Sequence, residues 1–175
     1  MMEPAEYSHI VRLSEIGSKP KTGELIAGED ERCALALRFD IPEIDSITAT
    51  YTLAAGERGV AFSGLLKSDL HQSCAITGEP TPVQVNEEFD ILFIPKADAD
   101  IPEQEIELTE EECDLVEYEN GQIDLGEAIA QTLYLSLDPY LRGPNADAAA
   151  RKKGLKSEEE AGPFGALAAL KDKLG

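Results

Sequence analysis

Apolar and polar residues alternate over most of residues 45–95, which is the pattern of β-strands that bury one face. Gly- and Pro-rich breaks at residues 55–59 and 78–80 interrupt the alternation. The stretches follow each other too closely for crossover helices. We therefore expect an antiparallel meander of four to six strands that stays open or curls toward a barrel. The alternating sets are Ile47/Ala49/Tyr51/Leu53, Val60/Phe62/Gly64/Leu66, Leu70/Gln72/Cys74/Ile76, and Val83/Val85 followed by Phe89/Ile91/Phe93.

Two other stretches show helical spacing, and a short strand is expected within residues 7–13. The first helix is expected from Gly28, with acids in its first turn, to about Phe39. The second is clearer: Asp124 can cap it, Glu127 at the third helical position completes a capping box, and Asp138 with the following proline ends it. We expect its apolar stripe to cover the sheet, through Leu125, Ala128, Ile129, Thr132, Leu133, Ser136 and Leu137.

These elements predict the α+β fold class and a single domain over residues 1–141. Residues 142–162 are rich in Ala and charged residues and cannot form a core, so we expect a flexible linker there. A short helix is expected over residues 163–175, because proline suits a first helical position and apolar residues follow along one side. A helix this short needs a surface to pack on, either its own domain or a partner, which makes Phe164 and Leu167 candidate contact residues.

The distribution of charge narrows the choice of partners. The formal net charge is −20, and residues 98–141 hold 14 Asp and Glu residues without any Lys or Arg, whereas residues 142–175 hold 5 acids and 7 bases. A charge of this sign repels phosphate backbones at long range, so it favours basic partners or serves solubility. We expect residues 96–112 to form an exposed acidic loop, in which Glu110, Glu111 and Glu112 either bind a basic partner or are simply solvated.

Catalytic chemistry finds little support in the sequence, and we predict that the chain is not an enzyme. His9 and His71 are the only histidines, and no Gly-x-Ser-x-Gly, phosphate-binding or dinucleotide-binding motif occurs. The three cysteines form no Cys-x-x-Cys pair, so we expect neither a disulfide framework nor a metal site, and no cofactor. No stretch is apolar for long enough to span a membrane, and we expect a cytoplasmic protein.

Three segments of the sequence are distinctive. They are QSCAITGEP at residues 72–80, DLVEYENGQIDLGEAI with QTLYLSL at residues 114–129 and 131–137, and GPFGALAALK at residues 162–171. In this order they resemble the central cysteine strand, the most characteristic stretch and the C-terminal motif of the YceD family, the large ribosomal RNA subunit accumulation proteins, in its alphaproteobacterial form.

The resemblance implies a non-enzymatic factor that supports accumulation, processing or stability of the 23S ribosomal RNA during assembly of the large ribosomal subunit in bacteria. Many members of the family carry a Cys-x-x-Cys at the central strand and further cysteines after the long helix, which look like zinc ligands. Here Cys74 is followed by Ala75, Ile76 and Thr77, and residues 140–144 contain no thiol. We therefore interpret Cys74 as a small buried hydrophobic residue and expect no metal.

Two modes of binding to the precursor large subunit stay open. Direct contact with 23S rRNA is expected from the tail, through Arg142, Arg151, Lys152, Lys153 and Lys156. In the other mode, the acidic residues 98–119 bind a basic ribosomal protein until rRNA displaces it, and we favour this mode slightly because family genes commonly neighbour one for a small basic large-subunit protein. The alternative class of function is an acidic protein-binding module or chaperone unrelated to ribosomes. The sequence leaves the oligomeric state open.

Overall fold

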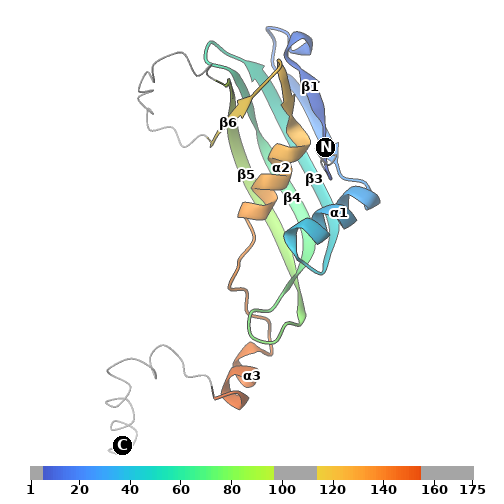
Figure 1. Ribbon diagram of the computed structural model, residues 1–175, viewed down its shortest axis with the longest axis vertical. Coiled ribbons are helices and arrows are strands. Elements are labelled where there is room, and N and C mark those ends of the chain that lie inside the picture. Colours follow the sequence, from blue (N-terminus) through green and yellow to red (C-terminus); the bar gives the residue numbers. More distant parts are fainter. Residues whose placement is uncertain (1–5, 97–113, 155–175) are drawn as a thin grey trace, which may run out of the picture. The chain divides into compact units, whose positions relative to one another are not determined.

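The computed structural model describes residues 6–96 and 114–154, and these fall into two compact units (Figure 1). Unit 1 contains residues 1–71 and 82–137, and unit 2 contains residues 72–81 and 138–175. Unit 1 holds the sheet, two helices and the core, whereas the described part of unit 2 is a turn followed by a loop and a short helix. The predicted helix over residues 163–175 and most of the predicted acidic loop lie outside the described residues.

The main sheet has five strands in the order β2 (Lys21–Ile26), β3 (Glu43–Ala55), β4 (Val60–Ser73), β5 (Pro80–Pro95) and β6 (Asp114–Tyr118). β3 pairs antiparallel with β4, as predicted, and also with β2, a strand that the sequence analysis did not expect, but β6 runs parallel to β5. The prediction of an antiparallel sheet is therefore right only in part. Parallel neighbours need a connection of about a dozen residues or more, and residues 96–113, which the sequence analysis treated only as a loop, supply that length.

The described strands do not close into a barrel, because β2 and β6 remain the two edges of the main sheet. The predicted short strand near the N-terminus is present as β1 (Ile10–Arg12) and is followed by the 3-10 turn η1 (Leu13–Glu15). β1 pairs antiparallel with β7 (Gln122–Asp124) in a separate two-stranded sheet. The two strands predicted within residues 60–76 are a single long strand, β4.

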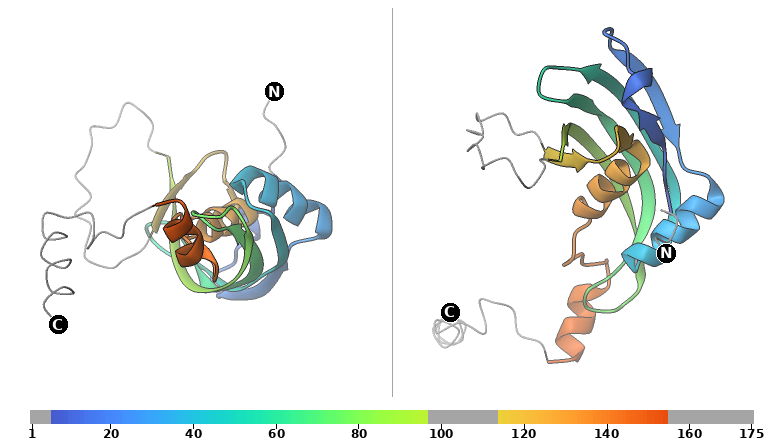
Figure 2. Two further views of the ribbon diagram at one scale, coloured as in Figure 1. Left: turned by 90° about the horizontal axis from the view of Figure 1, so that it is seen from below. Right: turned by 45° about the horizontal axis from the view of Figure 1, so that its top comes forward.

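Both helices of unit 1 begin and end close to their predicted bounds. α1 (Glu29–Phe39) starts after Gly28, whose backbone N–H donates to the Glu31 carboxylate at 2.6 Å. α2 (Leu125–Leu135) lies in the concave side of the curved sheet, and α1 lies beside it (Figures 1 and 2). None of the helices in the described residues is long and apolar enough to cross a membrane.

The core forms between α2 and the concave face of the sheet. Leu125, Ile129 and Leu133 of the predicted stripe are each 0% exposed, which confirms that this stripe is buried. On the sheet side, the ring of Phe62 lies 4.8 Å from that of Phe89, measured between centroids, and two further aromatic rings pack around it. The α2 helix ends at Leu135, before the last two residues of the predicted stripe.

The N-terminal segment is fixed to the start of α2 by the helix cap. Asp124 Oδ1 accepts the backbone N–H groups of Gly126 and Glu127, as predicted for an N-cap, and also that of His9 at 2.8 Å. A Cβ at Gly126 would lie 2.7 Å from the carbonyl oxygen of Tyr7, so only glycine lets the segment pass this closely. The second half of the predicted capping box does not form, because the Glu127 carboxylate binds Arg38 instead.

Unit 2 is held together by hydrogen bonds between its two chain segments. The backbone N–H of Ala75 donates to the carbonyl of Leu141 at 2.8 Å, and the side-chain amide of Asn145 donates to Glu79 at 3.2 Å. Residues 142–162, predicted as a linker, contain a helix that the sequence analysis did not expect, α3 (Ala146–Lys152).

Candidate functional sites

Of the contact residues that the sequence analysis singled out, the structure describes Arg142, Arg151, Lys152 and Lys153. Arg151 and Lys152 are exposed in the last turn of α3, where positive charge complements the helix dipole. Lys153 follows them, and its Nζ donates to the carbonyl of Ile76 at 3.1 Å within unit 2. Lys153 therefore has a structural partner, which Arg151 and Lys152 lack in this part of the chain. The candidates outside the described residues are Glu110, Glu111, Glu112, Lys156, Phe164 and Leu167.

The two units differ in charge. The described residues of unit 1 include 19 Asp and Glu against 8 Lys and Arg, whereas those of unit 2 include 3 acids and 4 bases. Residues 98–112, outside the described part, add 8 further acids. Unit 1 is thus the acidic part of the protein, and the described part of unit 2 is close to neutral.

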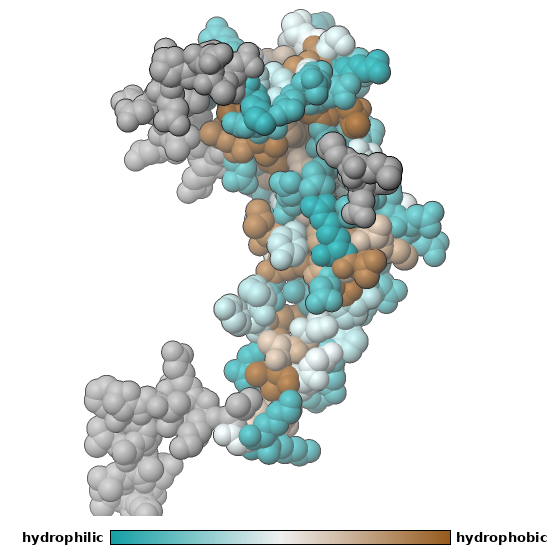
Figure 3. Space-filling view, in the orientation of Figure 1, coloured by the Kyte–Doolittle hydropathy of each residue, from teal (hydrophilic) through white to brown (hydrophobic). Residues whose placement is uncertain are grey.

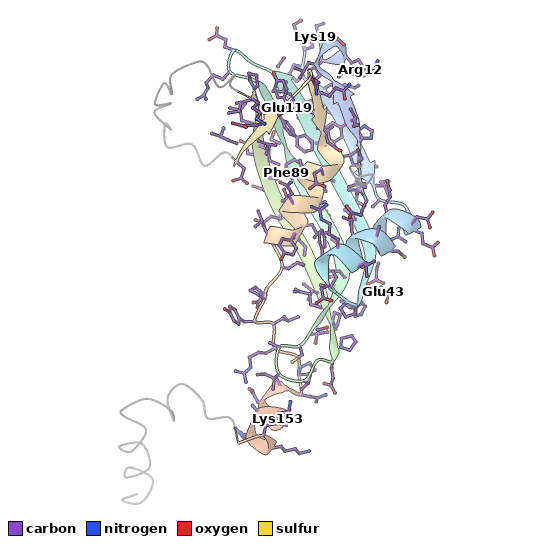
Figure 4. The ribbon with its side chains drawn as sticks, viewed as in Figure 1. Arg12, Lys19, Glu43, Phe89, Glu119 and Lys153 are labelled. Atoms are coloured by element: carbon purple, nitrogen blue, oxygen red, sulfur yellow. The ribbon has the colours of Figure 1, made fainter. Side chains whose placement is uncertain are left out.

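Within unit 1, cations gather at one end of the sheet. Arg12 and Lys19 lie close together there (Figure 4), and Arg58 lines a hollow of about 270 Å³ whose other walls include Leu13 and Tyr118. The sequence analysis missed this grouping, because Arg58 is far in sequence from Lys19 and from Arg12 at the end of β1, and only folding brings the three cations to one end. Acids occur in the same segments, so the end is mixed in charge rather than a basic face.

A partly buried ion pair joins the two helices of unit 1. Arg38 of α1 donates to both carboxylate oxygens of Glu127 on α2, at 2.8 and 2.7 Å, and to Glu6 at 3.3 Å. The hydrogen bonds from Arg38 hold the pKa of Glu127 below its ordinary value. The arrangement is a structural clamp between α1 and α2, with two acids sharing one guanidinium.

The Cys74 thiol is a buried nucleophilic group with several hydrogen-bond donors around it. It is 2% exposed, and its Sγ accepts the backbone N–H of Gly143 at 3.3 Å. Hydrogen bonds from the Thr77 hydroxyl and from the amides of Gly143, Thr77 and Ile76 lower its pKa to about 7. The sequence analysis was right that Cys74 is buried but missed this polar role, because Gly143 lies 69 residues away along the chain.

The residues around Cys74 do not fit the zinc site that the family resemblance implies. Gly143, whose backbone lies beside Cys74, offers no ligand, and a Cβ there would lie 2.7 Å from the hydroxyl oxygen of Thr81. Thr77, three residues after Cys74, presents a hydroxyl instead of a thiolate. A single thiol is well short of the four ligands of a structural zinc site.

Exposed apolar side chains occur where α1 and α2 end. Tyr134 is 55% exposed and Leu135 is 78% exposed, and with Arg38 and Phe39 they line a hollow of about 280 Å³. Hydrophobic side chains reach the surface among polar ones over these helices (Figure 3). A second, larger hollow of about 780 Å³ lies on the main sheet and crosses β2 to β5. Thr, Ser and Gly residues of β2, β3 and β4 form most of its lining.

The described residues define an α+β protein in which an open, mixed sheet carries α2 in its concave side, with α1 beside that helix (Figure 2). The model of the family described as large ribosomal RNA subunit accumulation protein YceD matches residues 62–171. This match covers well over half of the chain, and the chain belongs to that family. It includes all three segments on which the resemblance rested. Neither a search of curated proteins nor one of solved structures found a match.

Proposed function

We propose that this chain supports the accumulation of 23S ribosomal RNA by binding a component of the precursor large subunit in the cytoplasm. The observation that carries the proposal is membership of a family described by large ribosomal RNA subunit accumulation. The matched region runs from β4 through α2 and α3 to residue 171, so it includes both the acidic segment and the basic end of α3.

We also propose that the chain catalyses no reaction. Among the described residues, no hydrogen bond joins a histidine side chain to a serine, threonine or cysteine, which is the contact that activates a nucleophile. The Cys74 thiol has the lowered pKa that such chemistry needs, but it is 2% exposed and its neighbours supply backbone and hydroxyl donors rather than a base. Binding is therefore the activity that this part of the chain supports best.

A basic ribosomal protein is the partner that the charge distribution favours. The acidic excess of unit 1 and of residues 98–112 attracts cations and repels the phosphate backbone of RNA. Of the three exposed cations at the end of α3, Lys153 already donates to Ile76, which leaves Arg151 and Lys152, and neutralising two phosphates gives a small, strongly salt-dependent contribution to RNA affinity. We therefore assign the main contact to the acidic segment and a secondary one to Arg151 and Lys152.

Sedimentation of cell extract tests the proposal. The full-length chain should migrate with precursor particles of the large subunit and should be absent from mature small subunits. An acidic module or chaperone unrelated to ribosomes would instead remain in the light fractions, together with its own clients. That result would contradict the proposed ribosomal function.

Two sets of substitutions separate the modes of binding. Exchanging Glu110, Glu111 and Glu112 for Gln should weaken association with precursor particles and flatten its salt dependence, because charge steering acts over a Debye length of about 8 Å at physiological ionic strength. Exchanging Arg151 and Lys152 for Ala should instead lower the log–log salt slope of RNA binding by up to about two, one for each lost phosphate contact.

The control for net charge is the double exchange of Glu87 and Glu88 for Gln, which removes two exposed charges from β5. If this control weakens association as much as the exchange at residues 110–112, the effect is one of overall charge, and no specific acidic surface is involved. If only the exchange at Arg151 and Lys152 weakens association, direct RNA contact replaces protein docking as the mode.

A further inference from the structure

Three side chains able to bind a metal ion lie together at one end of the main sheet. Glu43 and Asp45 come from β3 and His71 from β4, and one ligand atom of each lies within 4.8 Å of the other two. Figure 4 shows Glu43 at the end of the sheet opposite Arg12 and Lys19. Unlike the Cys74 turn, this group combines an imidazole with two carboxylates.

The pairing of β3 with β4 produces this arrangement. Glu43 stands opposite His71 in the register, and the neighbouring Ile44 is 5% exposed, so Ile44 faces the core while Glu43 and His71 face outward. The register then shifts between Ile44 and Ser46, which leaves Asp45 as the extra residue of a β-bulge. A bulge re-aims the side chain it carries, and here Asp45 lies on the outer face beside His71.

The imidazole of His71 supplies a second observation, which concerns its Nδ1 atom. Its Nδ1 is shielded from solvent and has no hydrogen-bond partner. Asp45 Oδ2 lies 3.3 Å away, within ion-pair distance, but the geometry does not make a hydrogen bond. Buried polar atoms normally have a partner, and in the tautomer that leaves Nδ1 unprotonated its lone pair faces the Asp45 carboxylate and is repelled by it. A cation between the two groups satisfies both.

We propose that Glu43, Asp45 and His71 bind one divalent transition-metal ion. Imidazole and carboxylate together suit zinc and its neighbours, whereas Mg²⁺ and Ca²⁺ prefer oxygen ligands alone. Zinc takes such ligands at about 2.0–2.2 Å, so the three ligand atoms must move slightly closer together. The side chain of Asp45 is 45% exposed and can rotate to do so.

The ion links the first residues of β3 to the last outward side chain of β4 before the chain enters unit 2. Three protein ligands leave at least one position of a tetrahedral ion for water or for a side chain of a partner. The site is separate from the proposed ribosomal contacts, and the inference does not depend on them.

Titration of the chelator-treated, full-length chain with Zn²⁺ tests the site, with the heat of binding and the imidazole resonances as readouts. The chain has only two histidines, so His9 serves as an internal reference. One equivalent of Zn²⁺ should shift the His71 resonances and leave those of His9 in place. Asp45→Asn and His71→Gln should each weaken Zn²⁺ binding by at least about tenfold, and Mg²⁺ in excess should not displace the ion.

Matched variants test three other groups that could bind zinc. Cys33→Ser removes the exposed thiol, Glu88→Gln removes an exposed acid from the same outer face, and the triple exchange at residues 110–112 removes acids from the acidic segment. None of the three should change the affinity by more than about twofold, within the range of an uninvolved surface group. The proposal is overturned if His71 does not respond to Zn²⁺, or if one of these controls weakens binding as much as Asp45→Asn does.

Discussion

Tyr7 is a buried residue with an unsatisfied polar group. It is 3% exposed, and its hydroxyl has no hydrogen-bond partner. Burial, with the nearby Glu31 and Asp124, raises the pKa of Tyr7 to about 12, so the hydroxyl stays protonated at any ordinary pH. What the side chain contributes is its ring, which belongs to the core cluster.

We predict that Tyr7→Phe keeps the free energy of unfolding or raises it by about 1 kcal/mol, because a buried hydroxyl without a partner costs more than it contributes. Urea unfolding measures the change. Tyr134→Phe, at a side chain that is 55% exposed, is the matched control and should change nothing measurable. A loss of stability in Tyr7→Phe alone would mean that the hydroxyl has a partner in solution.

At the scale of the element, α2 carries the core. Leu133 is 0% exposed, and Leu135, two residues later on the same helix, is 78% exposed. We predict that Leu133→Asp lowers the free energy of unfolding by several kcal/mol, because it takes an unpaired charge out of water. Leu135→Asp should change it by no more than about 0.5 kcal/mol. Equal effects of the two substitutions on the thermal midpoint would contradict the packing of the Leu133 face of α2 against the sheet.

The clamp between α1 and α2 predicts a pH dependence. Arg38 holds the pKa of Glu127 below its ordinary value, so the clamp is fully effective above the unfolded carboxyl pKa of about 4.3 and is lost as the pH falls through the lower folded value. Glu127→Gln should therefore be less stable than the natural chain near pH 7, by about 1 kcal/mol for a pair that is about one-third exposed.

Denaturant unfolding at a series of pH values tests this dependence. The difference between Glu127→Gln and the natural chain should shrink between about pH 5 and pH 3, since the unfolded carboxyl titrates in that range. Glu119, whose pair with Lys96 is more than half exposed, is the control, and Glu119→Gln should have a much smaller effect. A difference that stays constant down to pH 3 would show that the Glu127 charge does not stabilise the fold.

The two helices of unit 1 could be predicted because their signals are local, whereas α3 was not expected. The Asp124 cap lies next to the residues whose N–H groups it accepts, and the acids of the first turn of α1 adjoin its start. β2 could not be predicted, because only one of its residues is buried and the strand therefore lacks an apolar alternation. It forms by pairing with β3. The same holds for β6, whose parallel partner β5 lies beyond residues 96–113.

The candidate sites could be predicted less well than the helices, because side chains distant in sequence form them. The group of Glu43, Asp45 and His71 depends on one strand register and on a bulge of one residue, and neither leaves a local pattern. The contact between Cys74 and Gly143 joins the two segments of unit 2. Only the basic residues of α3 were found from the sequence, since they are consecutive.

For the whole molecule, the difference in charge between the acidic unit 1 and the nearly neutral described part of unit 2 is the physical basis of the proposed function. Unit 1 and the acidic segment attract basic partners. The exposed cations of α3 attract the phosphate groups of nearby RNA. A factor built in this way can hold a basic ribosomal protein without competing strongly for the RNA to which that protein will bind. The proposal therefore joins rRNA accumulation to the delivery of a protein rather than to RNA chemistry.

The ratio of large-subunit to small-subunit ribosomal RNA, measured after deletion of the gene and again after its return, tests this account most directly. Unprotected large-subunit precursors are degraded if their assembly stalls, so the account predicts that the ratio falls on deletion and recovers with the natural chain. Return of the chain with Glu110, Glu111 and Glu112 exchanged for Gln should restore it only partly. A ratio that does not change on deletion would contradict the account.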